Sequence, residues 1–113
     1  MRGKLHGIPI VVKDNYNVAG MPTSAGSVAL TDLTVTEDAP TVAKLREAGA
    51  VILAKANMSE FAYSAVDSHS TLGGNAHNAY DPTRMPGGSS GGTATAVRSN
   101  FGNVKVSTTL RVK

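Results

Sequence analysis

Two short apolar runs and one apolar stripe at helical spacing dominate the hydrophobic pattern of the chain. The run IPIVV at about residues 8–12 has no alternating polar position, which predicts a strand buried on both faces. A similar run predicts a second strand at about residues 51–55. Between the two runs, Val42, Leu45 and Ala48 recur at helical spacing. The order strand, helix, strand predicts a crossover unit with two parallel strands.

Capping and stop signals place the ends of the predicted helices. Asp38 is expected to cap the first helix, Pro40 suits its first turn, and Gly49 is expected to end it. A short helix is expected after the second strand, with Ser59 as its cap and Phe61 as its main apolar contact. Together with the two strands, these signals predict an α/β fold.

The remaining segments are rich in glycine, proline and small residues. Residues 19–27 contain two glycines and a proline and should be irregular. No sustained period runs through residues 67–86, which predicts a long loop of the kind that is usually functional or disordered. The segment TATAVRSNF, residues 93–101, is expected to form a helix with a small-residue face.

Composition narrows the class of protein. A length of 113 residues favours a single domain, and 41% hydrophobic with 17% charged residues is typical of globular chains. The net charge of +3 is spread without a basic run or interleaved aromatics, so nucleic acid is not an expected partner. Cysteine is absent, which excludes thiolate chemistry. No run is long enough to span a bilayer and no secretion signal is visible, so no membrane partner and a cytoplasmic location are expected.

Metal and carboxylate chemistry find little support. The three histidines, at positions 6, 69 and 77, do not share the spacing of metal ligands, so neither a metal nor a cofactor is expected. Asp14 and Glu60 are isolated carboxylates, which argues against a pair that works as general acid and base.

The segment PGGSSGG, residues 86–92, is open to three interpretations. It can be a flexible linker. It can be a phosphate-binding loop, since Gly87 and Gly92 have the right separation, but Thr93 stands where the lysine of such a loop belongs. It can also present Ser89 or Ser90 to a lysine that serves as a base.

Lys13 is the best-placed lysine for such a pairing, because it follows the first buried strand. Desolvation at this place would lower the pKa of its amine, whereas the adjacent Asp14 would oppose that effect if its carboxylate pointed inward. The alternative is an ordinary strand-end lysine whose amine reaches out into water.

Three long segments, in order and at similar spacing, resemble the amidase signature family of serine hydrolases. They read GKLHGIPIVVKDNYNVAGMPTSAGS, DAPTVAKLREAGAVILAKANMSEFA and PGGSSGGTATAV. The resemblance runs from Gly3 to about Gly102 and points to the bacterial amidase branch, with the A subunits of glutamyl-tRNA amidotransferases sharing the same motifs. It implies a partial α/β amidase-signature fold over residues 1–102, in which flanking helices cover a short parallel or mixed sheet, followed by a divergent tail at 103–113.

In this family a Ser-cisSer-Lys triad hydrolyses carboxamides. The resemblance assigns the lysine to Lys13 and the middle serine, held by a cis peptide bond, to Ser89. It implies a small-molecule amide as substrate and no cofactor. In such a relay the lysine takes a proton from the middle serine, which takes one from the nucleophile.

The chain departs from the family pattern at the nucleophile. Counting on from Ser89 puts Lys113 in the nucleophile's place, the glycine-rich turn expected there is missing after Gly102, and Ser107 comes too early to replace it. We therefore expect a fragment truncated at both ends that is inactive alone. The alternatives are a non-catalytic piece that pairs with a partner chain through open sheet edges, and a non-functional gene product.

Overall fold

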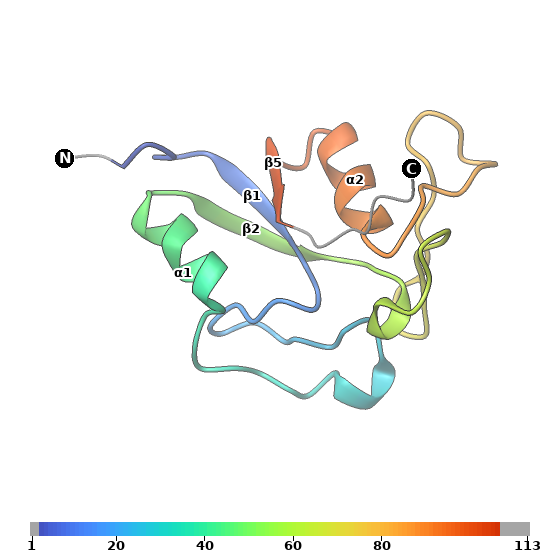
Figure 1. Cartoon of the computed structure of the whole chain (residues 1–113), viewed down its shortest axis with the longest axis horizontal. Helices are drawn as coiled ribbons and strands as arrows, with labels where there is room; N and C mark the ends of the chain where they lie inside the picture. The colour runs from blue at the N-terminus through green and yellow to red at the C-terminus, as the bar shows by residue number, and fades with distance from the viewer. Residues whose placement is uncertain (1–2, 107–113) are drawn as a thin grey trace.

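A three-stranded parallel sheet forms the centre of the molecule (Figure 1). The structure is a computed structural model that describes residues 3–106. Strand β1 (Pro9–Lys13) lies between β2 (Val51–Ala56) and β5 (Val104–Val106) and runs parallel to both. Strand β1 is the central strand, with β2 on one side and β5 on the other. Its last four side chains are buried, as the uninterrupted apolar run predicts. The two predicted strands and their parallel pairing are confirmed.

Helix α1 (Pro40–Glu47) completes the predicted crossover between β1 and β2. Its fully buried Val42 joins Ile10, Val12 and Val18 in the main hydrophobic cluster. The even-numbered side chains of β1 therefore face this cluster, and the odd-numbered ones face the other side of the sheet. This alternation determines the surroundings of the polar residues at the end of β1.

The cap of α1 is a correction to the sequence-based expectation. The N-cap is Ala39, not Asp38, because a proline at the first helical position forces the residue before it into an extended conformation. Asp38 instead accepts a hydrogen bond from the backbone N of Ala19 at 2.7 Å and pairs with Arg46 at 2.8 Å. Its carboxylate ties the preceding loop to the helix.

The segment after β2 is also a correction. It forms a single 3-10 turn, η2 (Glu60–Ala62), with Ser59 at the cap position but without a capping bond from its side chain. Phe61 is 61% exposed and adopts a positive φ of 49°, so it is not the buried contact expected. Met58, which is fully buried, fills that role two residues beyond the end of β2.

The expected long loop contains a little regular structure of its own. Strands β3 (His69–Ser70) and β4 (Gly74–Asn75) pair antiparallel as a short hairpin. The only other 3-10 turn within residues 3–106 is η1 (Val28–Leu30), which lies in the connection from β1 to α1. The rest of residues 67–86 is irregular, as the sequence predicts.

Helix α2 (Gly91–Arg98) confirms the last predicted helix and begins two residues before its expected start. It contacts both β1 and β5 on the side of the sheet away from α1 (Figure 1). The helix lies close to the segment after β2: a Cβ on Gly92 would come within 2.2 Å of the carbonyl oxygen of Asn57. Within residues 3–106, no helix is long and apolar enough to cross a bilayer.

Candidate active site

Lys13 ends β1 with its whole side chain buried. Its position is odd-numbered, so it points away from the core beneath α1 and toward the loop that precedes α2. There its Nζ lies 2.6 Å from Oγ of Ser89 and forms a hydrogen bond. The structure therefore brings together the two residues that the sequence singles out, and the amine of Lys13 does not reach out into water.

The burial of Lys13 shifts its protonation equilibrium toward the neutral amine. Burial lowers the pKa of Lys13 below its ordinary value, because removal from water penalises the ammonium form. A neutral Nζ has a lone pair that can accept the hydroxyl proton of Ser89. This pair has the chemical capacity of a base and a proton carrier.

Ser89 stands in an anchored loop, not in a free linker. The peptide bond between Gly88 and Ser89 is cis. The backbone N of Gly88 donates to the carbonyl of Ala65 at 3.0 Å, and the backbone N of Ser59 donates to the carbonyl of Ser89 at 3.0 Å. The segment after β2 thus holds the loop on both sides of the cis bond.

Ser68 adds a second anchor to the same loop. Its hydroxyl donates to the carbonyl of Gly87 at 3.0 Å and accepts from the backbone N of Gly91 at 2.7 Å. The fit is tight, since a Cβ on Gly88 would lie 1.8 Å from the carbonyl oxygen of Asp67. Sequence reasoning missed Ser68, which has no motif of its own and lies in the long loop.

The phosphate-binding interpretation finds no support in this loop. Thr93, which occupies the place of the lysine, is fully buried and donates its hydroxyl to the carbonyl of Ser90 at 2.7 Å. Its hydroxyl is used inside the first turn of α2 and takes no part of the kind that the lysine of a phosphate-binding loop plays.

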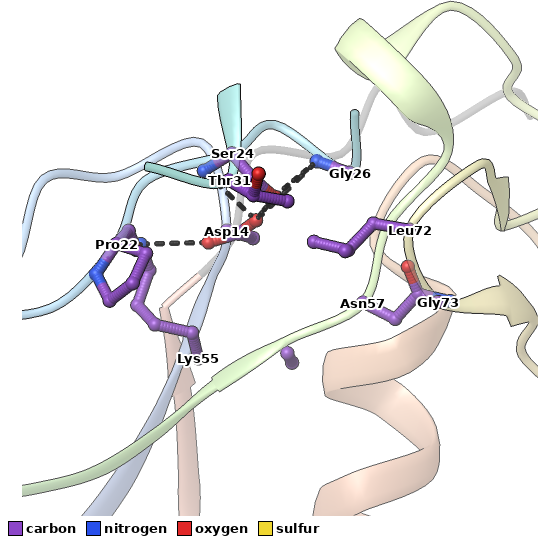
Figure 2. Close-up of a pocket in the computed structure, with 10 residues that line it drawn as sticks. Asp14, Pro22, Ser24, Gly26, Thr31, Lys55, Asn57, Leu72 and Gly73 are labelled. Atoms are coloured by element: carbon purple, nitrogen blue, oxygen red, sulfur yellow. Dashed lines mark hydrogen bonds and ion pairs between the residues drawn. The ribbon is translucent and has the colours of Figure 1, made fainter. Parts of the chain in front are cut away.

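Asp14 follows Lys13 directly but faces the other side of the sheet. Its Oδ1 pairs with Nζ of Lys55 at 2.9 Å. Its Oδ2 accepts from the backbone N of Ser24 at 3.2 Å, from the Ser24 hydroxyl, and from the backbone N of Gly26 at 3.4 Å. Figure 2 shows these contacts at one side of a cavity of about 450 Å³. Sequence reasoning missed the pairing of Lys55 with Asp14, which depends on the register between β1 and β2.

The other polar candidates serve local structure. His69 Nδ1 bonds to Oδ1 of Asn75 at 2.9 Å, and His77 Nδ1 bonds to the carbonyl of Pro82 at 3.1 Å. Glu60 accepts from the backbone N of Thr71 at 2.8 Å, and this hydrogen bond is the main reason why its pKa is lowered. In the described part of the chain, no group of three His, Cys, Asp or Glu side chains could hold a metal ion.

Ser107 and Lys113, the two positions considered for the nucleophile, lie outside the described residues. The boundary predicted after residue 102 stays a prediction. Strand β5 lies beyond it and pairs with β1.

The fold and the site define an α/β protein in which a buried lysine at the end of a parallel strand bonds to a half-buried serine. A family model described as Amidase matches residues 1–108. The chain therefore belongs to the amidase family, as the resemblance of its motifs indicates.

Curated relatives include the A subunits of glutamyl-tRNA(Gln) amidotransferases. The subunit from Acidothermus cellulolyticus is 46% identical over 95 residues, which are 84% of this chain and 19% of the relative. The subunit from Deinococcus radiodurans is 46% identical over 102 residues, which are 90% of this chain and 21% of the relative. This chain thus spans about a fifth of the length of these relatives.

Solved structures support the same assignment for the fold. The peptide amidase from Stenotrophomonas maltophilia matches with a TM-score of 0.87 at 46% identity, over 93% of this chain and 22% of that one. The A subunit of the glutamyl-tRNA(Gln) amidotransferase from Thermotoga maritima matches with a TM-score of 0.84 at 40% identity, over 89% of this chain and 22% of that chain. The α/β class and the partial amidase fold are confirmed.

Proposed function

We propose that this chain is the lysine-bearing part of an amidase-type hydrolase that cleaves the C–N bond of a small carboxamide by a Ser-cisSer-Lys mechanism. The single observation that carries the proposal is the 2.6 Å contact between Nζ of Lys13 and Oγ of Ser89. The burial of Lys13 supports it.

The two side chains have complementary tasks in this reaction. Neutral Lys13 takes the hydroxyl proton of Ser89, whose Oγ takes the proton of a nucleophilic hydroxyl as that oxygen attacks the amide carbon. When the C–N bond breaks, the proton returns from Lys13 through Ser89 to the leaving nitrogen. Water then cleaves the acyl ester by the same relay. The nucleophile is a third hydroxyl, supplied from outside residues 3–106.

We also propose that this chain alone hydrolyses no carboxamide, since it spans about a fifth of the amidase relatives. Acetamide and benzamide incubated with the purified chain should release no ammonia above that released with a Lys13→Ala, Ser89→Ala double variant. Turnover that disappears in the double variant would contradict the proposed inactivity.

A chimera tests the mechanism itself. Residues 3–102 of this chain would replace the matching segment of the Stenotrophomonas maltophilia peptide amidase, which is 46% identical. The chimera should hydrolyse peptide amides, and Lys13→Ala or Ser89→Ala should each lower kcat by about 10³-fold or more. Lys44→Ala, on the exposed side of α1, is the matched control. A Lys13→Ala chimera as active as the control would overturn the proposal.

A second candidate function is a non-catalytic piece that binds a partner chain. An apolar cavity of about 500 Å³ between β2 and α2 favours it, lined among others by Leu53 and Phe101, which are 49% and 66% exposed. The outer edges of β2 and β5 have no neighbouring strand within residues 3–106. Size-exclusion chromatography with circular dichroism tests this candidate: a folded monomer argues against it, and a self-associated or molten sample favours it.

A further inference from the structure

We propose that Ser68 is a positioning residue for the proposed reaction: its hydroxyl joins the two ends of the turn that carries Ser89 and so fixes the hydroxyl of Ser89 against the amine of Lys13. This inference rests on the proposed function, because it concerns the proton carrier of that reaction. Ser68 belongs to none of the three motif segments that carry the family resemblance.

The hairpin of β3 and β4 places Ser68 in the interior of the molecule. Ser68 directly precedes β3, and its carbonyl accepts from the backbone N of Ala76, just beyond β4, at 3.1 Å. Alternate residues of an extended segment face the same side. Ser68 and Ser70 are accordingly both buried, while His69 between them is exposed. The hairpin thus directs two serine hydroxyls inward, and the two have different partners.

The hydroxyl of Ser68 binds the chain on both sides of Ser89. It donates to the carbonyl of Gly87, two residues before Ser89, at 3.0 Å. It accepts from the backbone N of Gly91, two residues after Ser89, at 2.7 Å. A hydroxyl can be donor and acceptor at once, and Ser68 uses both capacities on one turn. Because Ser68 is only 2% exposed, water has little access to compete for either hydrogen bond.

The contact between Ser68 and Gly91 leaves little freedom. A Cβ on Gly91 would lie 2.4 Å from Oγ of Ser68, so the close approach requires glycine at this position. Gly91 is buried at the start of α2. Removal of the Ser68 hydroxyl would take away the acceptor of this buried N–H, which is unfavourable unless the turn moves to another partner.

A movement of the turn would act directly on the proposed proton transfer. Oγ of Ser89 lies 2.6 Å from Nζ of Lys13, within the range that proton transfer between two groups requires. A displacement of about 1 Å in a reacting group can lower the rate by about 100-fold. Ser68 therefore acts on the reaction through the position of Ser89.

Ser70 offers a matched control, since it is 1% exposed and lies in the same hairpin. Its hydroxyl donates to Oδ1 of Asn57 at 2.7 Å and accepts from the backbone N of Gly73 at 2.8 Å. Each of the two serines thus has one donated and one accepted hydrogen bond. The two partners of Ser70 lie outside the turn that carries Ser89.

Urea unfolding of the full chain tests the positioning without any turnover. Ser89→Ala removes the hydrogen bond to Lys13 and should raise the equilibrium constant of unfolding. In a Ser68→Ala background, the factor by which Ser89→Ala raises this constant should be at least about threefold smaller, because the contact is already weakened. In a Ser70→Ala background, the factor should equal that in the wild-type chain. Equal factors in all three backgrounds would overturn the inference.

The chimera with the Stenotrophomonas maltophilia peptide amidase tests the effect on the reaction and carries the test alone if Ser68→Ala does not fold in this chain. Ser68→Ala should lower the kcat of the chimera by about 10- to 100-fold and change KM by less than about threefold. Ser70→Ala, which also removes two buried hydrogen bonds, should leave kcat unchanged. An equal kcat in the two variants would contradict the role of Ser68.

Ser68→Thr tests whether the hydroxyl itself matters, because threonine retains it. The kcat of this chimera should stay within about threefold of the value for the unaltered chimera. A Ser68→Thr chimera as slow as Ser68→Ala would contradict the inference.

These outcomes distinguish the proposed function from the role of Ser68. A Lys13→Ala chimera as active as the Lys44→Ala control would contradict the proposed function. A chimera that loses turnover with Lys13→Ala but retains its kcat with Ser68→Ala would contradict only the role of Ser68.

Discussion

The amine nitrogen of Lys13 lies 2.6 Å from the hydroxyl oxygen of Ser89, which follows it by 76 residues in the sequence. The contact depends on three parts of the chain. β1 aims the lysine, the turn before α2 carries the serine, and the segments after β2 hold that turn through backbone and Ser68 hydrogen bonds. A change in any of the three should alter the pair.

Two neighbouring glycines give a matched test of the Ser89 turn. Gly88→Ala should destabilise the chain by about 3 kcal/mol or more, because its Cβ would lie 1.8 Å from the backbone oxygen of Asp67. A Cβ on Gly87 would meet no atom within 4 Å. Gly87→Ala should therefore lower stability by only about 1 kcal/mol, because a φ of +81° is unfavourable for alanine. Urea unfolding measures both. Equal losses would show that the turn is not packed as described.

The stability of the chain should depend on Lys13 at alkaline pH. Burial lowers the pKa of Lys13 in the folded state, whereas the unfolded chain retains a value near 10.5. Between these two values the unfolded state binds more protons, so the Lys13 contribution raises stability as pH increases and is least favourable below the folded-state pKa.

Replacement of Lys13 by methionine should therefore raise the free energy of unfolding at pH 7 by about 1 kcal/mol. It should also reduce the increase of that free energy between pH 7 and 10.5. Unfolding by urea between pH 7 and 10.5 measures the difference between the two proteins. Lys44→Met, at an exposed position, serves as the control. A parallel pH profile in Lys13→Met would contradict the lowered pKa.

Asp38 should stabilise the fold although it does not cap α1. Asp38→Ala removes the acceptor for the backbone N of Ala19 and the partner of Arg46, so we expect a loss of about 1–2 kcal/mol. Arg46→Ala should cost less than about 1 kcal/mol, since Arg46 is 43% exposed. Thermal unfolding measures both, with the exposed Asp32→Ala as the control. A larger loss for Arg46→Ala would show that the ion pair, not the backbone bond, dominates.

Replacement of Met58 by alanine should destabilise the chain more than replacement of the larger Phe61. Met58→Ala empties a fully buried site and should cost about 2–4 kcal/mol. Phe61→Ala removes a largely exposed ring and should change stability by less than about 0.5 kcal/mol. Chemical denaturation of both variants measures the contrast, and a large loss for Phe61→Ala would indicate that the ring is covered in solution.

The hydrophobic pattern predicts the strands and helices because their burial is regular. The uninterrupted run in β1 reflects two covered faces, and Val42 reflects the inward stripe of α1. The predictions are wrong at two places where the conformation of a single residue determines the local structure. Pro40 moves the cap from Asp38 to Ala39, and the positive φ of Phe61 turns its ring outward, which no periodicity shows.

The site was predictable in part for a similar reason. Motif resemblance and the position of Lys13 at a strand end single out the pair with Ser89. The anchoring of the Ser89 loop by Ser68 and the ion pair between Asp14 and Lys55 depend on strand register and on loop paths between distant segments. Pairings of this kind are set by tertiary structure and leave no local pattern.

The strand order has a consequence for how the molecule is made. β1 is the middle strand, yet it precedes both of its neighbours along the chain, and β5 follows it by roughly ninety residues. During synthesis on the ribosome, the apolar side chains of β1 therefore stay uncovered until β2 and β5 have been made.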